Sequence, residues 1–185
     1  MTRSQIIILN GVGSVGKSSI AREIQAIAAR PFLHVAMDAF LEMLPAAMMD
    51  HPDGLLFETT QEEGRPSIAI KTGPVLDRTL RGMRHAIAAM AAQGNDMVVD
   101  EVMLGLGEAQ AYRDLLTECD LRLVGLFAPL DVLERRERER GDRAIGLARW
   151  QFDRVHRDVV YDLKVDAAAG TPAEHARAIC EAFGL

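Results

Sequence analysis

The residues best suited to do chemistry form a glycine-rich loop close to the amino terminus. Residues 11–18 read GVGSVGKS; they follow the apolar run Ile6–Leu9 and precede residues 19–24, which predict a helix. Glycines let the backbone fold around a phosphate group with its N–H groups pointing inward, and the start of the helix adds partial positive charge. A glycine-rich turn without a ligand is the alternative, but strand, loop and helix in this order are the context that a phosphate-binding loop requires.

Lys17 and Ser18 define the expected chemistry of this loop. The lysine amine can reach the β- and γ-phosphates of a nucleotide, and the serine hydroxyl can bind Mg²⁺. We therefore predict a site for ATP and Mg²⁺ in which Lys17 also acts in catalysis. The predicted nucleotide contacts come from Gly11, Val12, Gly13, Ser14, Val15, Gly16, Lys17, Ser18 and Ser19.

Asp100 is the predicted second ligand on the metal side. It follows the apolar run Met97–Val99 directly, and an acid at the end of such a strand can hold Mg²⁺ or its water opposite Ser18. Glu101 beside it could assist. The alternative is an ordinary acid at the end of a strand.

Asp38 is the candidate catalytic base. It follows the short apolar run Phe32–Met37, and ligands in open α/β sheets bind outside the carboxyl ends of strands. Phosphoryl transfer to a hydroxyl needs a group that orients the acceptor and takes its proton. Asp is also a favoured N-cap, so Asp38 could instead cap a helix that begins near Ala39.

An arginine-rich segment late in the chain predicts a lid. Five arginines lie between residues 134 and 143, around Gly141. Such a segment can close over phosphates and stabilise the charge of a transferring phosphoryl group. We expect the lid at about residues 130–148, with Arg140 and Arg143 as the candidate catalytic arginines. A solvated helix with ion pairs such as Glu134 with Arg138 is the alternative.

Five short apolar runs alternate with segments of helical periodicity. The runs lie at about 5–9, 32–37, 97–99, 121–127 and 161–165, and the helical segments at about 18–29, 38–49, 74–93, 107–118, 130–140, 149–157 and 171–183. Strands alternating with helices indicate a parallel sheet covered on both faces. The predicted fold is therefore α/β: a P-loop NTPase of the nucleotide-kinase-like type, with about five parallel strands, in one domain over residues 1–185.

The stretch from about 39 to 73 is the expected acceptor side. Residues 51–72 have no helical stripe and predict a hairpin or a partly ordered insertion. Apolar residues, several of them methionines, gather just before and within it and suit a pocket for an amphipathic small molecule, although core packing explains them equally well. They are Phe40, Met43, Leu44, Met48, Met49, Leu55, Leu56 and Phe57.

Composition excludes several other classes of protein. The net charge of −6 argues against nucleic-acid binding, which needs a basic face. No apolar run approaches the length that spans a bilayer, and no signal peptide is visible. The two cysteines form no C-x-x-C pattern. We expect a cytoplasmic protein without membrane or nucleic-acid partners, and the oligomeric state stays open.

Over nearly its whole length the sequence resembles the chloramphenicol phosphotransferase-like P-loop kinases. The resemblance is carried by the loop at 11–18, VAMDAFLEMLP at 35–45, VVDEVMLG at 98–105, RGDRAIG at 140–146 and HRDVVYDLKVD at 156–166. It implies ATP-dependent transfer of the γ-phosphoryl group to a hydroxyl of a small molecule, with Asp38 as the base and residues 140–143 near the ATP phosphates.

The resemblance is poorest where the acceptor would bind, from Ala46 to Ile70, and Glu101 stands where a second Asp is common. The reaction class therefore carries over better than the substrate. A kinase for a sugar, a nucleoside or a nucleotide-sugar is one alternative, and a non-catalytic ATP-binding module is the other.

Overall fold

The computed structural model describes residues 3–62, 64–141 and 144–185. Its centre is a five-stranded sheet with the order β2-β5-β1-β6-β7, in which every neighbouring pair is parallel. The strands are β1 (Gln5–Asn10), β2 (Phe32–Ala36), β5 (Asp96–Glu101), β6 (Asp120–Phe127) and β7 (Leu163–Asp166). The predicted fold class and the predicted number of strands are confirmed.

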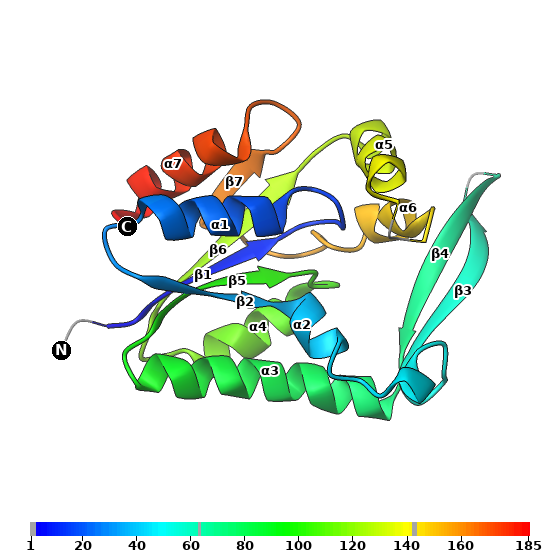
Figure 1. The fold of residues 1–185 in the computed structure, drawn as a ribbon, viewed down its shortest axis with the longest axis horizontal. Coiled ribbons are helices and arrows are strands. Elements are labelled where there is room, and N and C mark those ends of the chain that lie inside the picture. The colour runs from blue at the N-terminus through cyan, green and yellow to red at the C-terminus, as the bar shows by residue number, and fades with distance from the viewer. Residues whose placement is uncertain (1–2, 63, 142–143) are drawn as a thin grey trace.

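Helices cover both faces of this sheet (Figure 1). One face carries α1 (Lys17–Ile27) and α7 (Pro172–Phe183), and the other carries α3 (Pro74–Ala92) and α4 (Leu106–Leu115). Strand β1 lies in the middle, and its residues Ile6–Leu9 are completely buried because both faces are covered. Alternate residues of β1 enter two separate apolar clusters, with Ile7 and Leu9 on the α1 side and Ile6 and Ile8 on the α3 side.

The segment from about 39 to 73 forms a small unit beside the sheet. It contains α2 (Met37–Leu41), a 3₁₀ turn (Ala46–Met48) and a hairpin of β3 (Leu55–Glu62) and β4 (Arg65–Thr72). Figure 1 shows this hairpin standing apart from the five-stranded sheet, next to α6 (Leu147–Phe152). A third apolar cluster of Leu44, Leu55 and Leu76 joins the segment to the start of α3. The hairpin expectation is confirmed.

Three sequence-based boundaries need correction. The helix expected over 38–49 ends at Leu41, and the chain resumes only as the 3₁₀ turn. Pro45 accounts for this break, since proline disfavours helical backbone at the residue before it and cannot donate the hydrogen bond that a continuing helix needs. The helix expected over 149–157 is the shorter α6, and the last strand begins at Leu163 instead of Tyr161.

Helices α5 (Leu130–Arg140) and α6 lie beyond the carboxyl ends of the strands (Figure 1). Gly141 ends α5 in a left-handed conformation. Glu137 fixes the start of α6, because its buried carboxylate accepts hydrogen bonds from the N–H groups of Gly146 at 2.8 Å and Ala148 at 2.7 Å. Within the described ranges, no helix is both long and apolar enough to cross a membrane.

Candidate active site

The glycine-rich loop connects the buried end of β1 to α1. Gly16 has φ +108° and Ser14 has φ 63°, so two residues of the loop adopt left-handed backbone conformations before the helix begins at Lys17. Gly11 allows a close approach of backbones, since a Cβ atom there would lie 2.8 Å from the carbonyl oxygen of Leu126. The buried Ser14 hydroxyl oxygen has no hydrogen-bond partner among the described residues. A loop of this shape with an unsatisfied polar atom fits a phosphate ligand.

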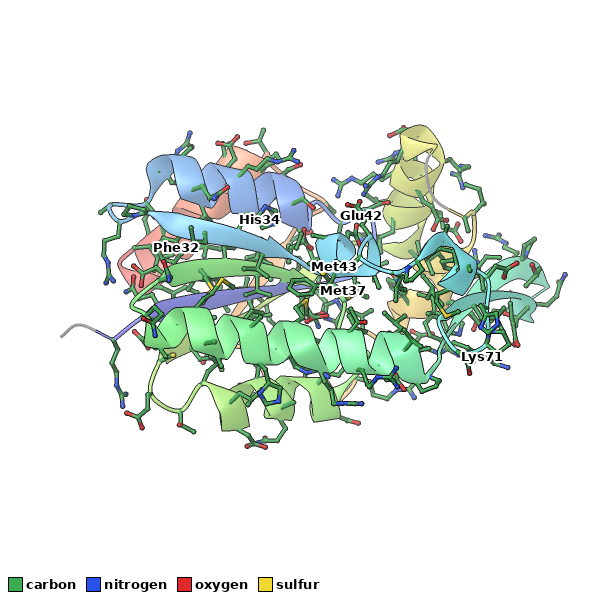
Figure 2. The ribbon with its side chains drawn as sticks, turned by 60° about the horizontal axis from the view of Figure 1, so that its bottom comes forward. Phe32, His34, Met37, Glu42, Met43 and Lys71 are labelled. Atoms are coloured by element: carbon green, nitrogen blue, oxygen red, sulfur yellow. The ribbon has the colours of Figure 1, made fainter. Side chains whose placement is uncertain are left out.

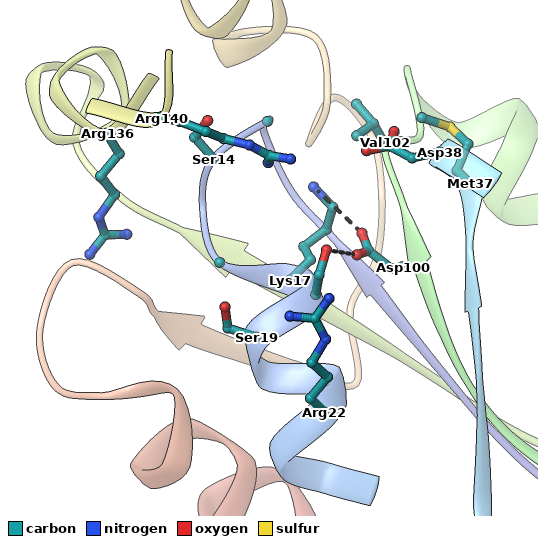
Figure 3. Close-up of a pocket in the computed structure, with 13 residues that line it drawn as sticks. Ser14, Lys17, Ser19, Arg22, Met37, Asp38, Asp100, Val102, Arg136 and Arg140 are labelled. Atoms are coloured by element: carbon teal, nitrogen blue, oxygen red, sulfur yellow. Dashed lines mark hydrogen bonds and ion pairs between the residues drawn. The ribbon is translucent and has the colours of Figure 1, made fainter. Parts of the chain in front are cut away.

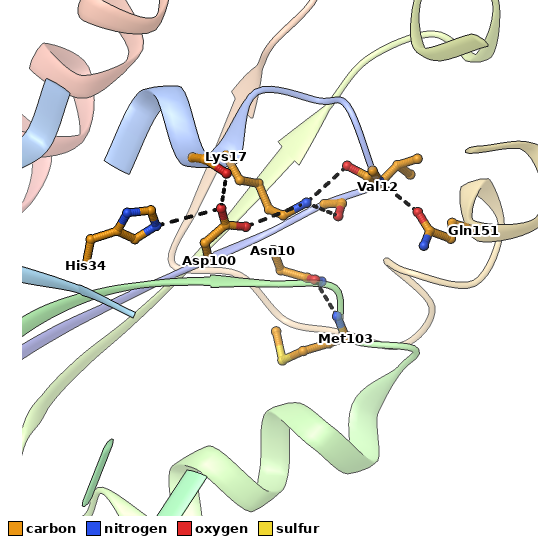
Figure 4. A network of polar contacts seen from close by, with 10 residues as sticks. Asn10, Val12, Lys17, His34, Asp100, Met103 and Gln151 are labelled. Carbon is orange, nitrogen blue, oxygen red and sulfur yellow. Dashed lines mark hydrogen bonds and ion pairs between the residues drawn. The ribbon is translucent and has the colours of Figure 1, made fainter. Parts of the chain in front are cut away.

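Lys17 lies folded under this loop (Figure 4). Its side chain is 8% exposed, and Nζ donates hydrogen bonds to the carbonyl oxygens of Gly11 at 2.9 Å and Val12 at 3.2 Å. The same nitrogen lies 3.9 Å from Asp100 Oδ1. The lysine charge is thus held beneath the loop by two of its carbonyl oxygens and by the carboxylate of the neighbouring strand.

Ser18 and Asp100 meet at the position expected for a metal. The Ser18 hydroxyl donates a hydrogen bond to Asp100 Oδ2, and the His34 ring lies 3.8 Å from the same oxygen. Burial acts to raise the pKa of Asp100, but the His34 ring, the Lys17 charge and the Ser18 hydroxyl outweigh it and hold the pKa below its usual value. Asp100 is therefore ionised at neutral pH.

The two oxygen donors of Ser18 and Asp100 fit Mg²⁺ better than a metal that takes all of its ligands from the protein. Mg²⁺ prefers oxygen ligands and usually combines one or two protein ligands with water and substrate phosphates. Among the described residues, no group of three or more His, Cys, Asp or Glu side chains is arranged to hold a metal. A metal bound at Ser18 and Asp100 would therefore take its remaining ligands from water and a bound nucleotide.

A cavity of about 360 Å³ lies over the loop, and positively charged side chains from two helices line it (Figure 3); we call it the phosphate cavity. Arg22 comes from α1, and Arg136 and Arg140 come from α5. Arg136 is held in place, because its guanidinium donates hydrogen bonds to the carbonyl oxygens of Val15 at 3.3 Å and Ala167 at 3.0 Å. Three guanidinium groups and one amine around a single cavity suit a ligand with several phosphates.

The outcome for the two expected lid arginines differs. Arg140 lines the phosphate cavity, and its role in catalysis stays a prediction. Arg143 lies outside the described residues. The alternative of a solvated helix with ion pairs is confirmed in part, since Arg135 pairs with Glu139 on the exposed side of α5 at 4.0 Å, whereas Glu134 pairs with the buried guanidinium of Arg149 and Arg138 is exposed.

Asp38 lies where three cavities meet. It lines the phosphate cavity together with Lys17 and Asp100, and it also lines two further cavities on the side of the hairpin. Asp38 is the second residue of α2. The N-cap of this helix is Ala36, and no side-chain hydrogen bond caps it. The alternative role of Asp38 as an N-cap is therefore wrong.

The first cavity on the hairpin side is largely apolar and has a volume of about 230 Å³. Most of its apolar wall comes from α2, the hairpin and α3, which contribute Leu41, Leu55, Phe57, Ile70, Leu76 and Leu80, and Met37, Val102, Leu104 and Leu147 line it as well. Charged side chains of α3 and α4 line it as well: Asp77, Arg81, Arg84 and Glu108. Of the eight apolar residues singled out in the sequence, only Leu55 and Phe57 line this cavity; Leu44 and Met49 line the second one, where Arg140 joins Asp38.

Most of the remaining members of that apolar group have other positions. Met43 is 67% exposed, and Figure 2 shows it with Glu42 on the connection between β2 and the hairpin. Phe40 packs against the cluster on the α3 face of the sheet, and Met48 packs beside Leu44. The expected methionine-rich wall is therefore mostly leucine, with Phe57 and Ile70 from the hairpin.

Glu101 does not assist at the metal position. Successive residues of a strand point to opposite faces, so Glu101 faces α4 while Asp100 faces the loop. The Tyr112 hydroxyl donates a hydrogen bond to its carboxylate at 2.5 Å. Burial raises the pKa of Glu101 to about 7, the Tyr112 hydrogen bond opposes this rise, and Glu108 adds to it.

His156 and Tyr161 have a structural role in holding the end of β1. Asn10 is completely buried and donates hydrogen bonds to the Tyr161 hydroxyl at 2.7 Å and the Val155 carbonyl oxygen at 2.9 Å, while its own oxygen accepts from Met103 N. Tyr161 in turn contacts His156 Nδ1 at 2.7 Å. Burial lowers the pKa of His156 to about 4, so the ring is neutral.

Three residues near the cavities were not singled out from the sequence. Arg22 lies one turn after Ser18 and Arg136 one turn before Arg140, so helical spacing from the two predicted residues was an available signal. Gln151 accepts a hydrogen bond from the N–H of Gly13 in the loop at 2.7 Å. No local pattern marks Gln151, because the two residues are 138 positions apart.

Comparison with known proteins decides the family. The sequence model described as chloramphenicol phosphotransferase-like protein matches residues 4–184. The chain belongs to this family. Two Mycobacterium tuberculosis proteins, from strains H37Rv and CDC 1551, are each 29% identical to it over 188 residues, which cover 99% of this chain and 84% of theirs; both are named as candidate O-phosphotransferases. The family member described here is accordingly a P-loop phosphotransferase.

Several solved structures of similar fold are kinases. The APS kinase CysC of M. tuberculosis, solved with AMPPNP and APS, has a TM-score of 0.67 at 16% identity and is covered over 100% of both chains. A gluconokinase from Sinorhizobium meliloti 1021 has a TM-score of 0.65 at 21% identity, over 99% of this chain and 94% of its own. At these identities the similarity establishes the P-loop kinase fold.

Proposed function

We propose that this protein transfers the γ-phosphoryl group of ATP to a hydroxyl group of a small molecule. The observation that carries the proposal is the position of Asp38, which lines both the phosphate cavity and the apolar cavity beside the hairpin. A carboxylate at this boundary can accept the proton of an acceptor hydroxyl as the phosphoryl group arrives from the other side.

The nucleotide side of the proposal rests on the loop and its charges. The loop N–H groups and Lys17 would hold the phosphates, and Ser18 and Asp100 would hold Mg²⁺, which neutralises phosphate charge when bound. Arg136 and Arg140 supply cationic groups above the same cavity, where charge develops during transfer. Lys17 already lines the phosphate cavity, so it needs little reorganisation to reach a ligand there.

The acceptor side of the proposal rests on the cavities that Asp38 shares with the hairpin. Their apolar walls favour an acceptor with an apolar body, and the charged side chains of α3 favour polar groups at its other end. Family membership supports transfer to oxygen, and the name of the family makes chloramphenicol the first acceptor to test. The kinase structures of similar fold support ATP as the donor, since one of them was solved with the ATP analogue AMPPNP.

The test is a transfer assay with ATP, Mg²⁺ and a panel of hydroxyl acceptors that includes chloramphenicol, sugars and nucleosides. We expect one acceptor to gain a phosphoryl group, detected by mass spectrometry, with stoichiometric ADP. Asp38→Asn should retain ATP affinity and lose about 10²- to 10⁴-fold in transfer rate, as expected for loss of a general base.

Asp114→Asn is the matched control, because Asp114 is an exposed aspartate on α4 that accepts a hydrogen bond from the exposed Gln110. It should transfer at the rate of the unchanged protein. Transfer by Asp38→Asn at close to the original rate would remove Asp38 as the base, whereas ATP binding without any phosphorylated acceptor would contradict the proposed function itself.

A further inference from the structure

Gln151 connects the phosphate loop to the apolar cavity. The residue is 3% exposed, and its Oε1 accepts the hydrogen bond from Gly13 N at 2.7 Å (Figure 4). The donor is a backbone N–H, so the atom that faces it must be the amide oxygen. The amide nitrogen Nε2 is therefore directed away from the loop.

The amide nitrogen Nε2 can donate two hydrogen bonds, and it has no acceptor within the described parts of the chain. Gln151 lines the apolar cavity beside Asp38, Val102 and Leu147. Because Gln151 lines this cavity and its oxygen is held by Gly13, a ligand oxygen in the cavity is a favourable partner for the remaining amide donor. Gly13 lines the phosphate cavity on the other side of the same hydrogen bond.

The helix that carries Gln151 is anchored on three sides. Glu137 accepts from Gly146 N and Ala148 N, and Glu134 pairs with Arg149. The hairpin adds a third anchor, since Ile68 N donates to the Gly146 carbonyl oxygen at 3.1 Å. These contacts hold α6 between α5 and the hairpin, so the position of Gln151 depends on both sides of the site.

We propose that Gln151 positions the acceptor: Gly13 holds its Oε1, and its Nε2 donates a hydrogen bond to an oxygen atom of the acceptor molecule in the apolar cavity. This proposal rests on the proposed function. It adds that the acceptor carries an oxygen able to accept a hydrogen bond on the side of α6, and that loop and acceptor are held in register by one side chain.

Two substitutions separate the two bonds. Gln151→Met keeps the approximate size but removes both. Gln151→Glu keeps an oxygen for Gly13 N–H, and its second oxygen cannot donate while the carboxyl is ionised. Burial raises the pKa of a carboxyl group, so this variant should regain a donor O–H as the pH is lowered. Gln110→Met, at an exposed position of α4, is the control.

The first measurement is transfer to the acceptor that the panel identifies, at pH 6 and pH 8 with saturating ATP. Loss of one neutral hydrogen bond corresponds to about three- to tenfold, so we expect the acceptor KM to rise at least that much in Gln151→Met, with the Kd for ATP unchanged within about threefold. In Gln151→Glu, measured against the unchanged protein, the KM should be lower at pH 6 than at pH 8. Equal KM values in all four proteins would overturn the proposal. It would also be overturned if Gln151→Met raised the Kd for ATP by as large a factor as the acceptor KM.

The second measurement needs no acceptor and uses Trp150, the only tryptophan and the neighbour of Gln151. Addition of AMPPNP with Mg²⁺ should change its fluorescence, because Gly13 is bonded to α6, and Gln151→Met should bind AMPPNP by calorimetry without this change. An equal fluorescence change in Gln151→Met would contradict the connection between loop and helix. If no acceptor in the panel is phosphorylated, the proposed function fails and the acceptor contact of Gln151 fails with it, while the fluorescence still decides the loop contact.

Discussion

The buried carboxyl of Glu101 makes the stability of this protein depend on pH in a defined direction. Glu101 is 2% exposed, and burial raises the pKa of its carboxyl group from 4.5 to about 7. Between these two values the folded protein keeps the proton on Glu101, while the unfolded chain loses it. The folded state thus binds more protons in this range, so the free energy of unfolding contributed by Glu101 is present below pH 4.5 and falls as the pH rises to about 7.

The magnitude follows from the size of the shift. The shift runs from 4.5 to about 7, and one pH unit corresponds to about 1.4 kcal/mol, so Glu101 withdraws about 3 kcal/mol across this range. Glu101→Gln removes the titration and retains an oxygen that can accept the Tyr112 hydrogen bond. The constant cost or gain of the amide is the same at every pH and therefore cancels in a comparison of slopes.

The assay is urea unfolding of the unchanged protein, Glu101→Gln and Glu118→Gln at intervals from pH 4.5 to pH 8. Glu118 is the control because its side chain is 92% exposed. Relative to the unchanged protein, the free energy of unfolding of Glu101→Gln should rise by about 3 kcal/mol from the lowest to the highest pH. The free energy of unfolding of Glu118→Gln should change with pH in the same way as that of the unchanged protein. A constant difference between Glu101→Gln and the unchanged protein would refute the assignment of a raised pKa to Glu101.

Three further predictions concern the phosphate cavity and the attachment of the hairpin. Lys17→Ala should weaken ATP binding and transfer together, whereas Lys71→Ala, on the exposed hairpin (Figure 2), should change neither; unchanged calorimetric affinity in Lys17→Ala would contradict the loop assignment. Arg136→Ala removes the guanidinium bonded to Val15 and should raise the Kd for ATP about tenfold or more, while the exposed Arg138→Ala should not, and equal Kd values would exclude Arg136 from the nucleotide site. Leu76→Ala should lower the free energy of unfolding by about 2 to 5 kcal/mol because Leu76 is 1% exposed, against less than about 0.5 kcal/mol for Leu33→Ala, which is 43% exposed; similar values for both would refute the role of the third cluster.

Local patterns were sufficient to predict the sheet and the loop. The strands are short apolar runs, and the loop has both a fixed spacing and a strand and helix around it, so each could be recognised within about 20 residues of sequence. The N-terminus of α7 shows the same, since Thr171 and Glu174, only three residues apart, form a capping box in which Thr171 Oγ1 accepts a hydrogen bond from Glu174 N. Such features depend on neighbours in the chain, which the sequence displays directly.

The parts that escaped prediction depend on contacts between distant residues. Whether Asp38 caps a helix or faces a cavity depends on where α2 begins, and α2 begins at Met37, two residues before the start near Ala39 that an N-cap at Asp38 requires. Glu101 looked like a partner of Asp100 because the two are adjacent, but the alternation of the strand separates them. Gln151 reaches Gly13 only through the packing of α6 against α5 and the hairpin, and nothing in the residues next to it records that packing.

The separation of the hairpin from the sheet has a consequence for how such a protein can change its substrate. The two apolar clusters on either face of the sheet contain no residue of β3 or β4, and the third cluster includes Leu55, Phe57 and Ile70 of the hairpin. Substitutions at hairpin positions therefore alter the wall of the acceptor cavity while the packing that holds Lys17, Ser18 and Asp100 stays intact. Reshaping the cavity-facing side chains Phe57 and Ile70 therefore offers a route to new acceptors that leaves the apolar packing around the central sheet unchanged.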